Sequence, residues 1–187
     1  MKQKAIFLDR DGTINVEKDY LYKIEDFEFL PGVIEGLQLL QDAGYLLIII
    51  TNQSGIARGY YTEEDYHTLN NWMVGELKSK GISIAAVYYC PHHPDAKMKA
   101  YRVDCNCRKP KLGMYERAIR DFNIDLCNSY TIGDKIRDSA ICEASSCHGY
   151  LIEANEKPET IKRVKAGAVH NVTYASDLLE AAKAIIS

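Results

Sequence analysis

The sequence predicts an α/β protein with a doubly wound parallel sheet, and three observations support this. Segments with helical spacing lie between short apolar runs, as in a Rossmann-like fold. Polar residues follow where several runs stop, which is where open α/β sheets bind their ligands. The runs themselves have the composition of buried parallel strands, at residues 5–8, 45–50, 85–89, 130–132 and 150–152.

Helical spacing is clearest at residues 33–44, 62–81 and 177–186. In the first segment Val33 and Leu37 recur on one face, and in the second Thr62 is a suitable N-cap residue. Residues 15–30 and 91–111 show no such pattern. Long irregular segments in a compact domain usually carry function, so both are candidate binding loops.

Length, composition and charge limit the kinds of protein that this sequence can encode. The 187 residues, 47% hydrophobic and 26% charged, predict a single soluble domain over residues 1–187. A net charge of −3 gives no electrostatic case for binding nucleic acid or an anionic membrane. The apolar runs are too short to cross a bilayer, and no signal-peptide pattern precedes Asp9, so we expect a cytoplasmic protein. Its six cysteines are then thiols or metal ligands rather than disulfides.

The most informative motif is Asp9-Arg10-Asp11-Gly12-Thr13, directly after the first apolar run. Two carboxylates at positions i and i+2 point roughly the same way and would repel a phosphate unless a cation such as Mg²⁺ lies between them. One carboxylate can then attack phosphorus while the other transfers the proton of the leaving group.

Three further polar clusters follow later strands. Thr51 to Gly55 begins where the second run stops, Arg108 to Pro110 lies in the long segment after the third, and Gly133 to Lys135 follows the fourth. Convergence of these clusters with the aspartate pair would bring together carboxylates, a hydroxyl, backbone amides and cations. Such a set suits phosphoryl transfer.

In order, the four clusters resemble the four motifs of the haloacid dehalogenase superfamily of phosphatases, over about residues 4–152. The resemblance implies that Asp9 is the nucleophile and forms an aspartyl-phosphate, and that Asp11 acts first as general acid and then as base. It assigns stabilisation of the phosphoryl group to Thr51 and Lys109. The implied Mg²⁺ ligands are the Asp9 carboxylate, the Asp11 backbone carbonyl and Asp134, with Asp138 in support.

A second constellation lies in a loop at about residues 90–109. Cys90, His92, Cys105 and Cys107 supply three sulfurs and one imidazole, which suit a tetrahedral Zn²⁺ site. His93 is the alternative to His92. The loop is polar and lacks apolar anchors, so a structural zinc would order it. Loss of the zinc would then lower activity indirectly, through a misplaced Lys109.

This cysteine-rich loop and the segments around it resemble the D-glycero-D-manno-heptose 1,7-bisphosphate 7-phosphatases. The resemblance implies a phosphorylated sugar as substrate. The contacts it implies with that substrate are Glu17, Lys18, Asp19, Tyr20, Thr51, Asn52, Gln53, Ser54, Arg108, Lys109 and Lys135. A second phosphate needs its own cation, and Arg108 is the best candidate, with Arg58 and Lys18 as weaker ones.

Other functions stay open on the sequence. Histidinol-phosphate phosphatases have a similar zinc loop, and a polynucleotide 3′-phosphatase would share the aspartate motif. The non-enzyme alternative is a zinc-stabilised binding module. Residues 13–31 have room for a flap but not for a folded cap domain, so we expect an open site in a monomer that binds neither nucleic acid nor membrane.

Overall fold

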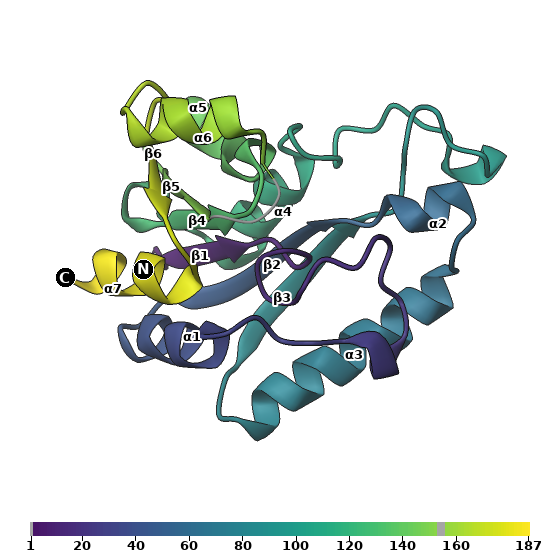
Figure 1. The fold of residues 1–187 in the computed structure, drawn as a ribbon, viewed down its shortest axis with the longest axis horizontal. Helices are drawn as coiled ribbons and strands as arrows, with labels where there is room; N and C mark the ends of the chain where they lie inside the picture. The colour runs from purple at the N-terminus through teal and green to yellow at the C-terminus, as the bar shows by residue number, and fades with distance from the viewer. Residues whose placement is uncertain (1, 153–155) are drawn as a thin grey trace.

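The computed structural model describes residues 2–152 and 156–187. Its centre is one sheet of parallel strands in the order β3-β2-β1-β4-β5-β6, shown in Figure 1. The doubly wound α/β fold is therefore confirmed, and it has one strand more than the sequence predicted, β6. The strands are β1 (Ala5–Leu8), β2 (Leu46–Asn52), β3 (Ile84–Cys90), β4 (Tyr130–Gly133), β5 (His148–Ile152) and β6 (Val172–Ala175).

Helices cover both faces of the sheet (Figure 1). One face carries α1 (Val33–Asp42), α3 (Glu63–Ser79) and α7 (Leu178–Ile186), and all three fall within the predicted helical segments. The other face carries α4 (Gly113–Phe122), α5 (Ala140–Glu143) and α6 (Pro158–Lys165), which the sequence analysis did not identify. A short helix, α2 (Ser54–Arg58), follows the carboxyl end of β2.

The central strand shows why the apolar runs are continuous. Ile6 and Leu8 pack in the core cluster beneath α1 and α7, while Ala5 and Phe7 pack in the cluster beneath α4. Successive strand residues point to opposite faces, so a strand covered on both sides needs an apolar residue at every position.

The helix predicted after Thr62 begins with a capping box. The Thr62 hydroxyl accepts a hydrogen bond from the backbone amide of Asp65 at 3.1 Å, and the Asp65 carboxylate accepts one from the Thr62 amide at 2.8 Å. These bonds satisfy amides that the first turn leaves without partners. Leu69 and Met73 lie on one face of this helix and are fully buried, and Met73 belongs to the same core cluster as Ile49 of β2.

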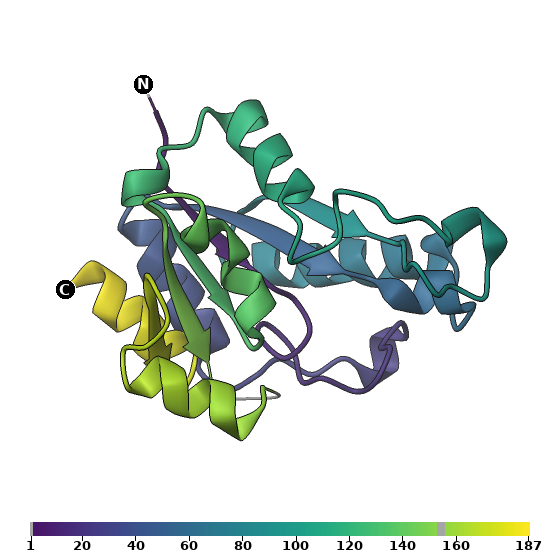
Figure 2. The same ribbon diagram turned by 90° about the horizontal axis from the view of Figure 1, so that it is seen from above.

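The strand order reverses beside β1, whose two neighbours are β2 and β4. In doubly wound sheets the ligand crevice lies at this switch point, outside the carboxyl ends of the strands. Two irregular connections border it, from β1 to α1 and from β3 to α4, and Figure 2 shows the second extending beyond the sheet beside α2. These connections contain the 3-10 turns Ile24–Asp26 and Lys99–Tyr101, and the first also has isolated β-bridges that join Asn15 to Asp11 and to Phe29. Among the described residues no helix is long and apolar enough to cross a membrane.

Candidate active site

The centre of the site is a buried group of charges at the ends of β1 and β4. The Lys109 ammonium lies 3.0 Å from the Asp9 carboxylate and 2.7 Å from that of Asp138, and it donates to the Ile50 carbonyl at 2.6 Å. Burial lowers the pKa of Lys109, but the two carboxylates raise it by more. Lys109 is therefore a fixed positive charge beside the predicted nucleophile.

Three buried carboxylates meet here around that single lysine. Oxygens of Asp9, Asp134 and Asp138 lie within 4.8 Å of one another. An excess of buried negative charge is costly unless a cation compensates it, and carboxylate oxygens are the ligands that Mg²⁺ prefers. The donor set therefore fits a magnesium ion, and Asp138 belongs to the same cluster of carboxylates as the predicted ligands Asp9 and Asp134.

The protonation of Asp9 reflects the same excess of charge. Burial raises the pKa of Asp9 to about 6 against the attraction of Lys109, and the negative charges of Asp138 and Asp11 raise it further. A divalent cation beside the carboxylate would favour the ionised form, which is the nucleophilic one.

Asp11, the predicted acid and base, lies in a separate network. Arg10, which is 1% exposed, binds both oxygens of the Asp11 carboxylate through Nε and Nη2 at 2.9 to 3.2 Å. Asn15 and Gln53 donate to the same carboxylate at 3.1 and 2.9 Å. The sequence predicted no role for Arg10, because the partner of a charged residue within a motif is visible only in the fold.

Residues at the end of β2 connect these two groups. Gln53 donates to the Thr51 hydroxyl at 2.9 Å as well as to Asp11. Asn52 accepts from the Lys109 backbone amide at 3.0 Å and donates to the Lys109 carbonyl at 3.1 Å. Through these contacts the Thr51 to Gln53 segment links the Lys109 backbone, the Thr51 hydroxyl and the Asp11 carboxylate at the end of β2.

A cleft of about 540 Å³ opens beside Asp11. Most of the predicted substrate contacts line it, namely Glu17, Asp19, Tyr20, Asn52, Gln53, Ser54, Arg108 and Lys135. Thr51 and Lys109 lie buried next to this lining. Lys18 is not among the lining residues; its ammonium donates to the Asp26 carbonyl at 2.8 Å and pairs with Glu28 at 3.4 Å.

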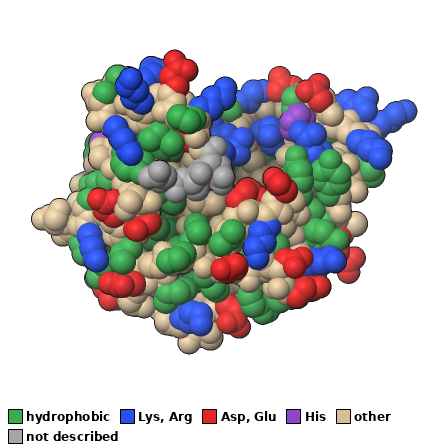
Figure 3. Space-filling view, in the orientation of Figure 1, with side chains coloured by type: hydrophobic (Ala, Val, Ile, Leu, Met, Phe, Trp, Pro, Cys, Tyr) green, Lys and Arg blue, Asp and Glu red, His purple; other side chains and the backbone are tan. Residues whose placement is uncertain are grey.

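The cleft has an uneven distribution of charge. Arg58, Arg108, Lys135 and Arg137 all line it, and none of them forms an ion pair with a carboxylate of the described residues. Burial lowers the pKa of Arg108, and the positive charges of Arg137 and Arg58 lower it further. Figure 3 shows Lys and Arg side chains gathered around a hollow, with acidic side chains along its lower edge. Repulsion among cations that lack partners is relieved by an anionic ligand.

The loop cysteines and one histidine form a compact cluster. The three sulfurs of Cys90, Cys105 and Cys107 are 3.0 to 3.5 Å apart, and His92 Nδ1 lies 3.5 Å from Cys107 and 3.8 Å from Cys90. A tetrahedral zinc with bonds of about 2.3 Å places neighbouring ligand atoms about 3.8 Å apart, so only a small expansion of this cluster is needed. The donor set therefore fits Zn²⁺.

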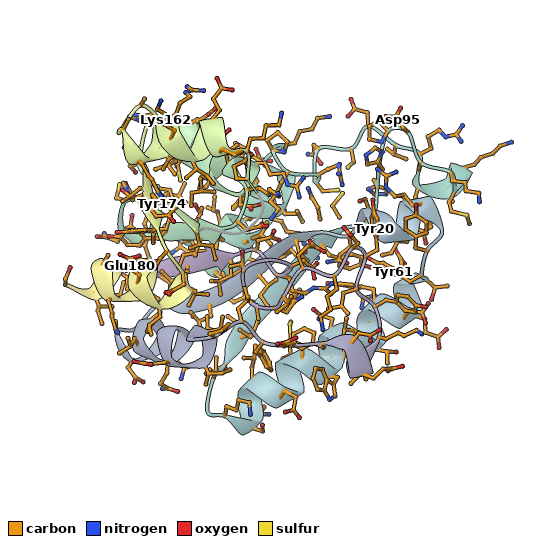
Figure 4. All side chains as sticks on the ribbon, in the orientation of Figure 1. Tyr20, Tyr61, Asp95, Lys162, Tyr174 and Glu180 are labelled. Atoms are coloured by element: carbon orange, nitrogen blue, oxygen red, sulfur yellow. The ribbon has the colours of Figure 1, made fainter. Side chains whose placement is uncertain are left out.

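His93, the alternative ligand, lies beside the cleft residue Arg58 instead. Its Nε2 is 3.4 Å from Arg58 Nη2, and its Nδ1 accepts from the Asp95 amide at 3.1 Å. Figure 4 shows the loop that carries Asp95 on the opposite side of the site from Tyr20 and Tyr61. Two of the residues that line the cleft, Tyr61 and Arg137, were not predicted. The only sequence signal for Arg137 was its position two residues after Lys135.

The fold and the site together define a phosphatase of the haloacid dehalogenase superfamily. Residues 4–147 match the family model described as polynucleotide kinase 3 phosphatase. The chain is 50% identical over 179 residues to the D-glycero-alpha-D-manno-heptose-1,7-bisphosphate 7-phosphatase of Photorhabdus laumondii, covering 96% of this chain and 98% of that one. It is 48% identical over 146 residues to the corresponding beta-heptose enzyme of Haemophilus ducreyi, covering 78% of this chain and 80% of that one.

A solved structure agrees with both relatives. The D,D-heptose 1,7-bisphosphate phosphatase of B. bronchiseptica, complexed with magnesium and phosphate, has a TM-score of 0.84 and 29% identity, over 98% of each chain. The chain belongs to the heptose-1,7-bisphosphate 7-phosphatase family.

Proposed function

We propose that this protein hydrolyses the 7-phosphate of a D-glycero-D-manno-heptose 1,7-bisphosphate in a Mg²⁺-dependent reaction through an aspartyl-phosphate. One observation carries the proposal: Asp11 lines a cleft together with a group of cations that have no carboxylate partner among the described residues, while Asp9, two residues before it, belongs to the buried carboxylate cluster. The relatives and the magnesium-bound neighbour named above support the same activity.

The chemistry follows from the placement of the residues. An Asp9 oxygen forms a bond to phosphorus while the bond from phosphorus to the sugar oxygen breaks, and Asp11 gives its proton to that oxygen. Asp11 then removes a proton from water, whose oxygen attacks phosphorus and releases inorganic phosphate and free Asp9. Thr51 and Lys109 stabilise the charge on the phosphoryl oxygens. Magnesium held by Asp9, Asp134 and the Asp11 carbonyl, beside Asp138, would offset the repulsion between carboxylate and phosphate.

A sugar bisphosphate matches the two sides of the cleft. The second phosphate would bind to Arg108, flanked by Arg58 and Arg137. The acids Glu17 and Asp19 line the same cleft and can accept hydrogen bonds from sugar hydroxyls. We also propose a structural zinc on the loop, because all four of its positions would be filled by protein and Arg108 follows its last ligand.

The family model keeps a polynucleotide 3′-phosphatase as the second candidate. The observations against it are the net charge of −3 and the acids within the cleft, since a polynucleotide would bring further phosphates close to both. Histidinol phosphate carries a single phosphate and would leave the second group of cations without a partner.

Phosphate release with Mg²⁺ tests the proposal across four substrates: the alpha and beta anomers of the heptose bisphosphate, histidinol phosphate and a 3′-phosphorylated oligonucleotide. Both anomers are included because relatives carry both names. We expect kcat/KM to be highest for a heptose bisphosphate and turnover to cease without Mg²⁺. A higher kcat/KM for either of the other two substrates would overturn the assignment.

A further inference from the structure

The general acid and base, Asp11, is held by a chain of hydrogen bonds that ends at Tyr61. The Tyr61 hydroxyl donates to Gln53 Oε1 at 2.6 Å, and Gln53 Nε2 donates to Asp11 Oδ2 at 2.9 Å. An amide that accepts at its oxygen presents its NH₂ group on the other side, so the short bond from Tyr61, together with a longer one from Arg10, holds the Gln53 amide with its NH₂ group toward Asp11.

The three residues joined by these hydrogen bonds are either buried or held by several contacts. Tyr61 is 6% exposed and Gln53 is 2% exposed, and the Tyr61 ring stacks on Tyr22 with centroids 5.5 Å apart. Arg10 Nη2 also donates to Gln53 Oε1, at 3.3 Å, and to both oxygens of the Asp11 carboxylate. Hydrogen bonds within such a buried network restrict the orientation of every member.

The absence of a side chain at Gly55 leaves room for the Tyr61 ring. A Cβ atom on Gly55 would lie 2.1 Å from Tyr61 Cε1 and 2.9 Å from its hydroxyl oxygen. Only glycine at this place in α2 therefore lets the hydroxyl reach Gln53.

We propose that Tyr61 is a positioning residue, which acts through Gln53 to place the Asp11 carboxyl where it protonates the leaving oxygen. The inference rests on the proposed function insofar as the leaving group is a sugar alkoxide. A positioned acid matters greatly for an alkoxide and little for a stable phenolate, because the phenolate leaves without a proton. The dependence of rate on the leaving group thus reports the position of Asp11 separately from the hold on the phosphoryl group.

The test compares Tyr61→Phe with the wild type on the heptose bisphosphate and on p-nitrophenyl phosphate. The parameter kcat/KM includes only the steps up to departure of the leaving group. For Tyr61→Phe we expect kcat/KM for the sugar ester to fall by about tenfold or more, and that for the aryl ester to change by less than about twofold. Gly55→Ala, which displaces the tyrosine, should show the same selective loss.

Tyr66→Phe is the matched control, since the buried Tyr66 hydroxyl has no hydrogen-bond partner among the described residues. It should leave both esters unaffected. Equal loss on both esters in Tyr61→Phe, or no loss on either, would overturn the proposal. If another alkyl phosphate proves to be the substrate, the comparison is made with that ester, so failure of the proposed substrate is distinguishable from failure of the inference.

Discussion

The aspartate centre, formed by Asp9, Asp134, Asp138 and Lys109, differs in its charge pairing from the cationic wall of the cleft. That wall is formed by Arg58, Arg108, Lys135 and Arg137. Asp9, Asp138 and Lys109 are each less than about one-tenth exposed, and the single lysine pairs with both acids. Arg108 and Arg137, by contrast, lie at the cleft surface with no carboxylate partner among residues 2–152 and 156–187. In the first region a lysine already offsets part of the negative charge, whereas the arginines of the second have only a ligand to offset theirs.

The difference separates two tasks. Reacting groups must be held within a fraction of an ångström, and strand ends in a packed sheet provide that rigidity. Recognition of the rest of the substrate can be left to irregular connections, provided that something orders them. Substitutions in the centre should therefore abolish chemistry, while those in the wall should change binding.

The largest effect is expected at the nucleophile. Asp9→Asn should lower kcat by at least about ten-thousandfold, because an amide cannot form the acyl-phosphate. Since burial raises the pKa of Asp9 to about 6, removing its charge should not lower the melting temperature of the metal-free protein. Steady-state kinetics and thermal unfolding check this, and near-normal turnover in a folded variant would exclude the mechanism.

Lys109→Met should reduce kcat by about 10² to 10³, the usual cost of losing a group that stabilises transition-state charge. It should also lower stability by about 3–5 kcal/mol, because buried carboxylates lose their cation. Lys111→Met is the control: Lys111 lies nearby on the surface, paired with Asp104, and its loss should change stability by less than about 0.5 kcal/mol. Similar losses in both variants would break the contrast between centre and surface.

Arg108→Ala tests the wall. It should raise KM for the bisphosphate by about tenfold or more and leave kcat nearly unchanged, because the interaction is with the part of the substrate that does not react. Arg137→Ala should act in the same direction. A heptose monophosphate phosphorylated only at C7 should be much less affected. Equal weakening of monophosphate and bisphosphate would show that Arg108 does not bind the second phosphate.

Removal of the proposed zinc should affect the cationic wall more than the aspartate centre. The sequence predicted indirect loss of activity through Lys109. Asn52 holds the Lys109 backbone to β2, however, whereas Arg108 donates to the carbonyl of His92, a proposed zinc ligand, at 3.3 Å. Cys105→Ser should therefore raise KM several-fold with a smaller change in kcat. Metal analysis should find one zinc per wild-type chain, and Cys127→Ser, at an exposed cysteine outside the cluster, is the control.

The smallest effect is a pH dependence of stability. The carboxyl pKa of Asp9 rises from 3.8 to about 6 on folding, so the native state binds more protons between these values and the metal-free protein loses stability as pH rises through them. Mg²⁺ prefers the carboxylate, so its stabilising effect should be largest above pH 6 and fade below it. Melting temperatures with and without Mg²⁺ at about pH 5 and 7.5 measure this; equal shifts at both would contradict it.

Much of the fold was predictable because its signals are local. The apolar runs marked β1 to β5, and Thr62 marked the start of α3. The elements that were missed have weaker signals: β6 has four residues with an exposed one among them, and Leu112 before α4 makes no side-chain cap. Their existence depends on packing against the sheet rather than on pattern.

The sequence by itself determined which residues are candidates for the chemistry and that the ends of several strands would present them. It did so because an acid pair, a threonine or a lysine following an apolar run is a local feature, and parallel strands bring such features to one edge. Only the tertiary structure decided the partners: Arg10 neutralises Asp11, Tyr61 orients Gln53, and Lys18 turns away toward Asp26. Contacts between side chains far apart in sequence depend on the whole packing of the chain, which no local pattern specifies.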